Sequence, residues 1–279
     1  MSVINTNISA MQAANASNSS QMMLSKSMEQ LSTGSQINSA ADNAAGLAIS
    51  TSMSSQINGM NQGIANANDG ISLSQTAQGS LTEVTNMLQR INTLAVQAST
   101  GTYQASDRTD MQSEVSSLTT QNTNILGNAK FNGNALFSTT SGTNVTFATQ
   151  AGANNGSGST VTLTSTGIDG TLLTNTASTG LNVSTAANAA STITNVQSLL
   201  TQVSTTDASL GAGQNQLQSA VNNMASTVTN LSAANSQITD TNYSTETTKL
   251  AKAQILSQAS TAMLAQANQS QQSVLSLLK

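Results

Sequence analysis

The sequence predicts a mainly α protein: an elongated helical bundle or coiled coil, which the N- and C-terminal segments build together around a small central region with a β-hairpin. Three observations predict this class. Residues 193–238 carry an apolar heptad repeat, residues 1–45 and 240–279 carry helical apolar stripes, and the middle is rich in Ser, Thr, Asn and Gly. Because neither terminal stripe can be buried within its own helix, we expect the two ends to pack against each other and then against neighbouring copies.

The first helix is predicted from an apolar stripe that Asn15 and Asn18 interrupt. The stripe consists of Ile4, Ile8, Met11, Ala14, Met22, Leu24, Met28 and Leu31. Thr33 and Gly34 should end this helix, because glycine is the usual left-handed helix stop. The chain is then expected to turn through 34–43 and to resume a helix at Ala44.

A second helical pattern runs from Gly46 to about Gly101. We expect a bend or a break at 68–70, where Asn-Asp-Gly is a weak point for a helix. Residues 102–106 should form a loop, and the Ser106 hydroxyl can cap a third helix that ends near Asn128.

Residues 128–185 change character. Asn- and Gly-rich turns separate short alternating runs at 145–147 and 161–164, a pattern typical of hairpin strands. Helical periodicity resumes near Ala186, with a joint expected at 240–244.

The heptad repeat of the fourth helix forms the predicted bundle seam. Its members are Val196, Val203, Leu210, Leu217, Met224, Leu231 and Ile238. A companion position carries Ile193, Leu200, Val221 and Val228, and is interrupted by Asp207 and Gln214. The last helix carries a broad stripe of Leu250, Ala253, Leu256, Met263, Leu264, Ala267, Val274, Leu275 and Leu278.

The composition excludes several classes of function. Charged residues make up 6% of the 279 residues, against about 25% in an ordinary globular domain, and the 7 cations are scattered, so a nucleic-acid footprint is absent. No run of about 18 apolar residues predicts membrane insertion, and the first residues do not resemble a secretory signal peptide. A generic soluble helical bundle is the plainest alternative at this stage.

Catalytic chemistry is not expected. The chain has no His and no Cys. Its one cluster of charges, Asp107, Arg108, Asp110 and Glu114, is better explained by the preference of a helix N-terminus for acidic residues. We therefore predict no enzymatic activity, no metal site and no cofactor.

At this point the residues carry a resemblance to bacterial flagellin. In the N-terminal half, the matching segments are 31–34 (LSTG), 37–40 (INSA), 42–49 (DNAAGLAI), 66–73 (NANDGISL), 88–91 (LQRI), 94–97 (LAVQ) and 130–133 (KFNG). In the C-terminal half, they are 210–212 (LGA), 214–215 (QN), Leu217, 252–256 (KAQIL) and 262–268 (AMLAQAN). Residues 138–185 lack a distinctive match. In flagellins, the corresponding segment is the variable, outward-facing part of the protein.

The resemblance implies a structural subunit of the bacterial flagellar filament, which serves swimming motility. It implies an extracellular protein that passes unfolded through the flagellar type III export channel without a cleavable signal peptide. The implied partners are other copies of the chain, a flagellar export chaperone, and the hook-filament junction and cap proteins. The implied parts are two halves of a filament core (1–43 and 240–279), two halves of a rod (44–137 and 186–239) and a short surface region with a β-hairpin (138–185).

Two sets of residues are expected to carry assembly. The heptad seam should hold the bundle, and the terminal stripes should line the filament core between subunits. The terminal set is Ile4, Ile8, Met11, Leu31, Leu250, Leu256, Met263, Leu264, Leu275 and Leu278. The chain departs from the family by losing charge, with Gln36, Ala41, Gln216 and Gln237 at usually basic positions, which puts the usual ion pairs between subunits in doubt.

A possible host contact follows from the resemblance alone. In some flagellins, the segment that matches Gln89, Arg90 and Leu94, with an acidic residue that matches Glu114, is read by a vertebrate innate immune receptor. The alternative roles are bundle packing for Leu94 and a subunit contact or ion pair for Arg90 and Glu114. Asn92 and Thr93, where the family often has charges, weigh against the receptor.

Two other classes of protein stay open on the residues. A secreted helical adhesin or translocator that borrows the architecture is the main alternative, and substitution of a terminal-helix residue such as Leu264 discriminates between the two. A glycan-processing enzyme or carbohydrate binder would need aromatic platforms or paired carboxylates, whereas aromatic residues are only 2% of the chain and dispersed.

Overall fold

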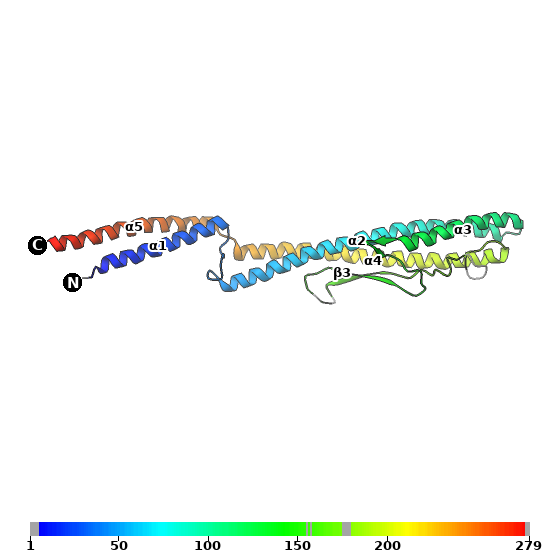
Figure 1. Ribbon diagram of the computed structural model, residues 1–279, viewed down its shortest axis with the longest axis horizontal. Coiled ribbons are helices and arrows are strands. Elements are labelled where there is room, and N and C mark those ends of the chain that lie inside the picture. Colours follow the sequence, from blue (N-terminus) through cyan, green and yellow to red (C-terminus); the bar gives the residue numbers. More distant parts are fainter. Residues whose placement is uncertain (1–5, 155, 157, 175–179, 277–279) are drawn as a thin grey trace. The chain divides into compact units, whose positions relative to one another are not determined.

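The computed structural model describes residues 6–154, 156, 158–174 and 180–276, the last four without their side chains. Within this part of the chain the protein is mainly α, with two small antiparallel strand pairs, so the predicted fold class is confirmed (Figure 1). The elements in chain order are α1 (Ile8–Thr33), α2 (Ala44–Ser99), α3 (Ala105–Asn128), β1 (Lys130–Phe131), β2 (Asn134–Ala135), β3 (Val145–Gln150), β4 (Thr160–Ser165), α4 (Ala186–Thr239) and α5 (Tyr243–Ser276).

The chain divides into two compact units. The terminal unit comprises Met1–Ser55 and Asn230–Lys279, and the bundle unit comprises Gln56–Thr229. Both divisions fall inside long helices, α2 and α4, rather than at the turns where the sequence places its domain boundaries. The five-part division therefore stays a prediction.

In the terminal unit, local capping determines where α1 begins and ends. The Asn7 side chain accepts a hydrogen bond from the Ala10 N–H, and Gly34 closes the helix in the left-handed conformation with φ 71°. A Cβ atom is disfavoured at such an angle, which is why glycine stands there. The predicted end at Thr33 and the predicted restart at Ala44 are both confirmed.

The two turns of the terminal unit are hydrogen-bonded to each other. Ser35 pairs with Asp240 in an antiparallel bridge. On either side of it, the Gln36 N–H donates to the Thr239 carbonyl at 2.6 Å and the Thr241 N–H donates to the Gly34 carbonyl at 2.9 Å. The α1–α2 and α4–α5 connections therefore form one joint, although they are far apart in the sequence.

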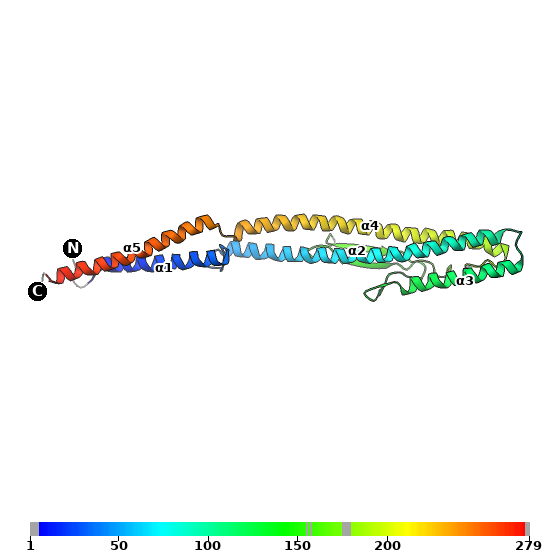
Figure 2. The same cartoon turned by 90° about the horizontal axis from the view of Figure 1, so that it is seen from above.

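In the bundle unit, α2, α3 and α4 run side by side (Figure 2). All three helices and the strand region contribute side chains to one continuous hydrophobic core. Its fully buried side chains include Leu81, Leu88, Ile91, Leu126, Leu199 and Leu210. The strands pair as the alternating pattern predicts, with Phe147 opposite Leu163 in the β3–β4 hairpin. Asn132 and Gly133, at φ 50° and 83°, make the tight turn between β1 and β2.

Gly70 does not break α2, contrary to the expectation from the sequence, because the helix is continuous from Ala44 to Ser99. A Cβ atom at Gly70 would lie 2.9 Å from Leu217 Cδ1 of α4 and 2.9 Å from Thr149 Oγ1 of β3. Glycine is needed there for close packing of the hairpin and α4, and this tertiary contact outweighs the weak helix propensity.

The start of α3 also differs from the expectation. The Asp107 carboxylate, and not the Ser106 hydroxyl, accepts the orphan Gln104 N–H at 2.9 Å. Arg108 closes the end of the preceding helix, since its Nε donates to the Ala98 carbonyl at 2.8 Å and its Nη2 to the Thr100 carbonyl at 2.9 Å. Asp107 thus has the role at the helix N-terminus that the sequence predicts for the cluster, and Arg108 closes the preceding helix.

Candidate functional site

Helices α1 and α5 pack against each other through small side chains. On α1 three of the four buried positions recur every seven residues, at Ala13, Ser20 and Ser27, and the fourth is Gln30. On α5 they are Glu246, Ala253 and Ala267, with Ser260 half-buried at the intervening heptad position. We call the seven positions other than Gln30 the terminal seam.

The terminal seam is antiparallel and close. Asn7 Nδ2 donates to the Ala267 carbonyl at 3.1 Å at one end, and Thr241 Oγ1 donates to the Gln30 carbonyl at 3.2 Å at the other. Within the described residues, α1 and α5 are the helices whose Cα atoms repeatedly approach within 8 Å. Small side chains permit this approach, since the distance between packed helices depends on the residues between them.

Many of the large apolar side chains of the terminal unit are exposed and lie outside its seam. The exposed ones are Ile8, Met11, Met22, Met23, Met28, Ile49, Tyr243, Ile255, Leu256 and Met263. Ile255, at 65% exposed, lies about 180° around α5 from Glu246, at roughly 100° per residue. An apolar surface of this extent on a single chain is typical of a protein interaction site.

The predicted filament-core residues fall into three groups. Ile8, Met11, Leu256 and Met263 are exposed on the single chain. Leu31, Leu250 and Leu264 are half-buried. Ile4 and Leu278 lie outside the described residues, as does the side chain of Leu275. Their role between subunits stays a prediction.

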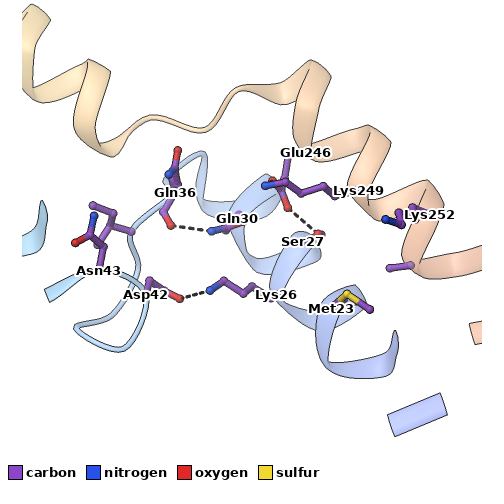
Figure 3. Close-up of a pocket in the computed structure, with 12 residues that line it drawn as sticks. Met23, Lys26, Ser27, Gln30, Gln36, Asp42, Asn43, Glu246, Lys249 and Lys252 are labelled. Carbon is purple, nitrogen blue, oxygen red and sulfur yellow. Dashed lines mark hydrogen bonds and ion pairs between the residues drawn. The ribbon is translucent and has the colours of Figure 1, made fainter. Parts of the chain in front are cut away.

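A charged cluster lies where α1, the 34–43 turn and α5 meet (Figure 3). Lys26 Nζ lies 2.9 Å from Asp42 Oδ1, across the turn. Ser27 Oγ donates to Glu246 Oε1 at 2.6 Å, and Lys249 Nζ lies 2.9 Å from Glu246 Oε2. Gln30 Nε2 donates to the Gln36 carbonyl at 2.7 Å. This network ties the turn to both helices.

The two carboxylates of the cluster are held in their charged form. The hydrogen bond from Lys26, with the N–H groups of Ser39 and Asn38, lowers the pKa of Asp42 to about 2. Burial alone would raise the pKa of Glu246, but the Ser27 hydroxyl and Lys249 outweigh burial, so this pKa lies below its ordinary value. A group held ionised by partners in this way is suited to a structural role and not to proton transfer.

The cluster lines a cavity of about 400 Å³, with Met23, Ile37 and Ala253 as its apolar wall. Sequence reasoning missed this cavity, because it depends on contacts between residues more than 200 positions apart.

Among the described residues, no group of three or more His, Cys, Asp or Glu side chains is placed to hold a metal ion. In the same part of the chain, no helix is long and apolar enough to cross a membrane.

The predicted bundle seam is brought together in the bundle unit as far as Met224. Val196, Val203, Leu210, Leu217 and Met224 are buried on α4. Leu231 and Ile238, which belong to the terminal unit, are only half-buried. The heptad therefore faces a core over its first five members.

The residues named for a host contact lie on α2 and α3. Arg90 Nε lies 2.7 Å from Glu114 Oε1, and both side chains are about half exposed. Gln89 is exposed, whereas Leu94 is buried in the core at 3% exposed. Leu94 thus packs within the bundle, and Arg90 and Glu114 form an ion pair.

Comparison with known proteins identifies relatives of this fold. Residues 4–145 match the family model for the bacterial flagellin N-terminal helical region, and residues 193–278 match the model for its C-terminal helical region. Flagellin FlaB1 of Treponema pallidum is 38% identical over 285 residues, which cover 99% of this chain and 100% of that protein. Flagellin of Bacillus subtilis is 40% identical over 302 residues, which cover 99% of each chain.

Two further matches are a flagellar filament protein and a flagellin of known structure. The flagellar filament 33 kDa core protein of Treponema phagedenis is 39% identical over 293 residues, which cover 99% of this chain and 100% of that protein. The crystal structure of Bacillus cereus flagellin aligns with a TM-score of 0.47 and 29% sequence identity, over 61% of this chain and 94% of that one.

Proposed function

The chain belongs to the bacterial flagellin family, and from this premise we propose that its terminal unit drives polymerisation through the outward apolar faces of α1 and α5. As a flagellin it is a structural, non-enzymatic subunit of the extracellular flagellar filament. The proposal concerns how this particular chain assembles.

The observation that carries the proposal is the direction of the large side chains in the terminal unit. Because the terminal seam uses Ala and Ser, Ile8 on α1 and Ile255 on α5 remain 55% and 65% exposed when α1 and α5 pair. Burial of apolar surface is the main favourable term in protein association, at roughly 25 cal/mol per Å². A neighbouring copy that covers these faces would supply that burial.

The bundle unit has a different role in this proposal. Its core is complete within one chain, so it can fold before assembly and position the two terminal helices. The five-part organisation, with filament-core segments at 1–43 and 240–279, rod segments at 44–137 and 186–239 and a surface region at 138–185, belongs to the same proposal.

The remaining partners are inferred from membership of the flagellin family. We propose a flagellar export chaperone, the hook-filament junction proteins and the cap proteins as further partners, and export without a cleavable signal peptide. Recognition by an innate immune receptor has weaker support on this chain. The burial of Leu94 and the pairing of Arg90 with Glu114 favour packing roles for these residues.

Seeded polymerisation of the full chain tests the proposal. Ile255→Asp and Ile8→Asp place a charge on exposed sites, so we expect an unchanged melting temperature for the monomer but loss of filaments in electron micrographs. Asn154→Asp, at an exposed position between β3 and β4, adds the same charge away from the terminal unit and should polymerise normally. Filaments from Ile255→Asp at the wild-type critical concentration would refute the proposed surface.

A further inference from the structure

Among the described residues, the exposed methionines lie in the terminal unit. Met11, Met22, Met23, Met28 and Met263 are 45% to 68% exposed. In the bundle unit, by contrast, Met111 and Met224 are buried, at 9% and 5% exposed, and Met60 and Met87 are half-buried. We call the five exposed residues the terminal methionines.

The four terminal methionines of α1 surround the part of the helix that α5 leaves open. At about 100° per residue, Met11 and Met22 lie within roughly 20° of each other and opposite the terminal seam. Met23 and Met28 flank the seam on its two sides, and Met23 also lines the cavity of the charged cluster (Figure 3). Any copy that packs on α1 must therefore cover thioether groups.

The thioether is also the main oxidisable group in this protein. The sequence has 11 Met but no Cys, no Trp and no His, and only 2 Tyr. Oxidation by a peroxide is thus directed to methionine, and among methionines to the accessible ones.

We propose that the terminal methionines are an oxidant-sensitive modification site that controls whether a subunit can join the polymer. This inference rests on the proposed role of the terminal unit in polymerisation. In the reaction, the thioether sulfur attacks hydrogen peroxide, a sulfur–oxygen bond forms and the O–O bond breaks. The sulfur is oxidised by two electrons to methionine sulfoxide, and the peroxide is reduced to water.

Oxidation should block association without unfolding the subunit. A sulfoxide is polar and opposes burial in an apolar interface. The terminal seam consists of Ala, Ser and Glu246, so none of these thioethers lies in it, and Met23, which lines the cavity of the charged cluster, is still 45% exposed. The reaction therefore acts on free subunits, whereas subunits already in a filament have their thioethers covered.

Peroxide treatment of the full-length monomer, with peptide mass spectrometry, tests the first step. We expect the terminal methionines to gain an oxygen atom at least ~10-fold faster than Met111 and Met224, because reactivity follows exposure. In assembled filaments the same five residues should react at least ~10-fold more slowly than in the monomer, since reactivity follows accessibility.

Seeded polymerisation of the oxidised monomer tests the second step. We expect the critical concentration to rise at least ~10-fold, with an unchanged circular dichroism melting curve. Treatment with methionine sulfoxide reductases of both stereospecificities should restore polymerisation, because each enzyme reduces one sulfoxide epimer.

Two variants keep the test specific. A full chain with Met→Leu at the five terminal methionines should remain able to polymerise after peroxide treatment. The matched control, with Met→Leu at Met111 and Met224, should be as sensitive as the wild type. Should the five-fold variant fail to polymerise even untreated, recovery of the oxidised wild type by the reductases decides the question.

The outcomes separate this inference from the proposed function. Oxidised monomers that polymerise at the wild-type critical concentration, or that are not rescued by the reductases, would overturn the methionine site alone. Terminal methionines that react in filaments as fast as in monomers would instead overturn the role of the terminal unit as the polymerisation surface.

Discussion

The two units of this chain use their large apolar side chains in opposite directions. In the bundle unit, residues such as Leu88 and Leu217 point into a core and are fully buried. In the terminal unit, residues of similar size such as Ile8 and Ile255 point away from the helix pair, and Ala and Ser fill the seam between the helices. The bundle unit thus buries its large apolar side chains within one chain, whereas the terminal unit leaves many of its own exposed.

This difference explains why two helical stripes of similar appearance have different consequences. A helical stripe that packs against large apolar residues of its own chain is buried on folding. A stripe on a helix that packs only through Ala and Ser stays exposed, and an exposed apolar face of this kind is typical of an interaction site. Three experiments test the contrast, each with a matched variant.

The largest expected effect is that of Leu217→Ala in the bundle unit. Leu217 is fully buried against Gly70, so the truncation leaves a cavity, and we expect a loss of about 2–5 kcal/mol in the free energy of unfolding. Ile255→Ala in the terminal unit removes the same number of carbon atoms from a side chain that is 65% exposed, and should cost far less in the monomer. Equal losses in urea denaturation would break the comparison.

The reverse substitution, Ala253→Leu, has the next largest effect. Ala253 is 2% exposed in the terminal seam, so a larger side chain forces α1 and α5 apart at a cost of about 1–3 kcal/mol. Hydrogen exchange of the α1 and α5 amides should become faster, while the bundle unit is unaffected. The control Ala251→Leu adds the same atoms at an exposed position, and faster exchange in both variants would contradict close packing at the seam.

The smallest effect is the pH response of the turn that Asp42 holds. Its pKa lies at about 2 in the folded chain, below its ordinary value of 3.8. The contribution of a carboxylate with a lowered pKa is present above the ordinary value and is lost as the pH falls through the folded value. Between about pH 4 and pH 2 we therefore expect the Asn38 and Ser39 amide resonances to shift as their hydrogen bonds to Asp42 are lost.

The matched variant for this titration is Asp42→Asn. It removes the ionisable group and the pairing with Lys26, so the Asn38 and Ser39 resonances should no longer follow this transition. An Asp42 carboxyl that titrates at its ordinary pKa in the wild type would show that the cluster does not hold the turn in solution.

Much of the fold could be predicted because its signals are local. The heptad from Val196, the glycine stop at Gly34 and the alternating runs of the hairpin are each visible within a short window of sequence, and the structure contains all three. The outward exposure of Ile8, Met11, Leu256 and Met263 also agrees with their assignment to contacts between subunits, which itself stays a prediction.

The missed features depend on contacts over long distances in the sequence. Gly70 looks like a helix breaker until Leu217 and Thr149 are placed beside it. The terminal seam was hidden because Ala and Ser are abundant throughout the chain, so their heptad spacing at 13, 20 and 27 has no contrast with its surroundings. The charged cluster depends on the hydrogen bond from Ser27 to Glu246, and these residues come within reach of each other only when α1 and α5 pair.

The joint formed by the α1–α2 and α4–α5 connections has a consequence for the order of folding. Its hydrogen bonds join residues such as Gln30 and Thr241, 211 positions apart, and closing so long a loop in an unfolded chain carries a large entropic cost. That cost falls once the bundle unit has formed, because α2 and α4 are then close at Gly63, where a Cβ atom would lie 3.0 Å from Met224 Sδ, and the loop that remains to be closed is much shorter. We therefore expect the terminal helices to pair after the bundle unit has formed, so that the outward apolar faces of α1 and α5 are arranged late in folding.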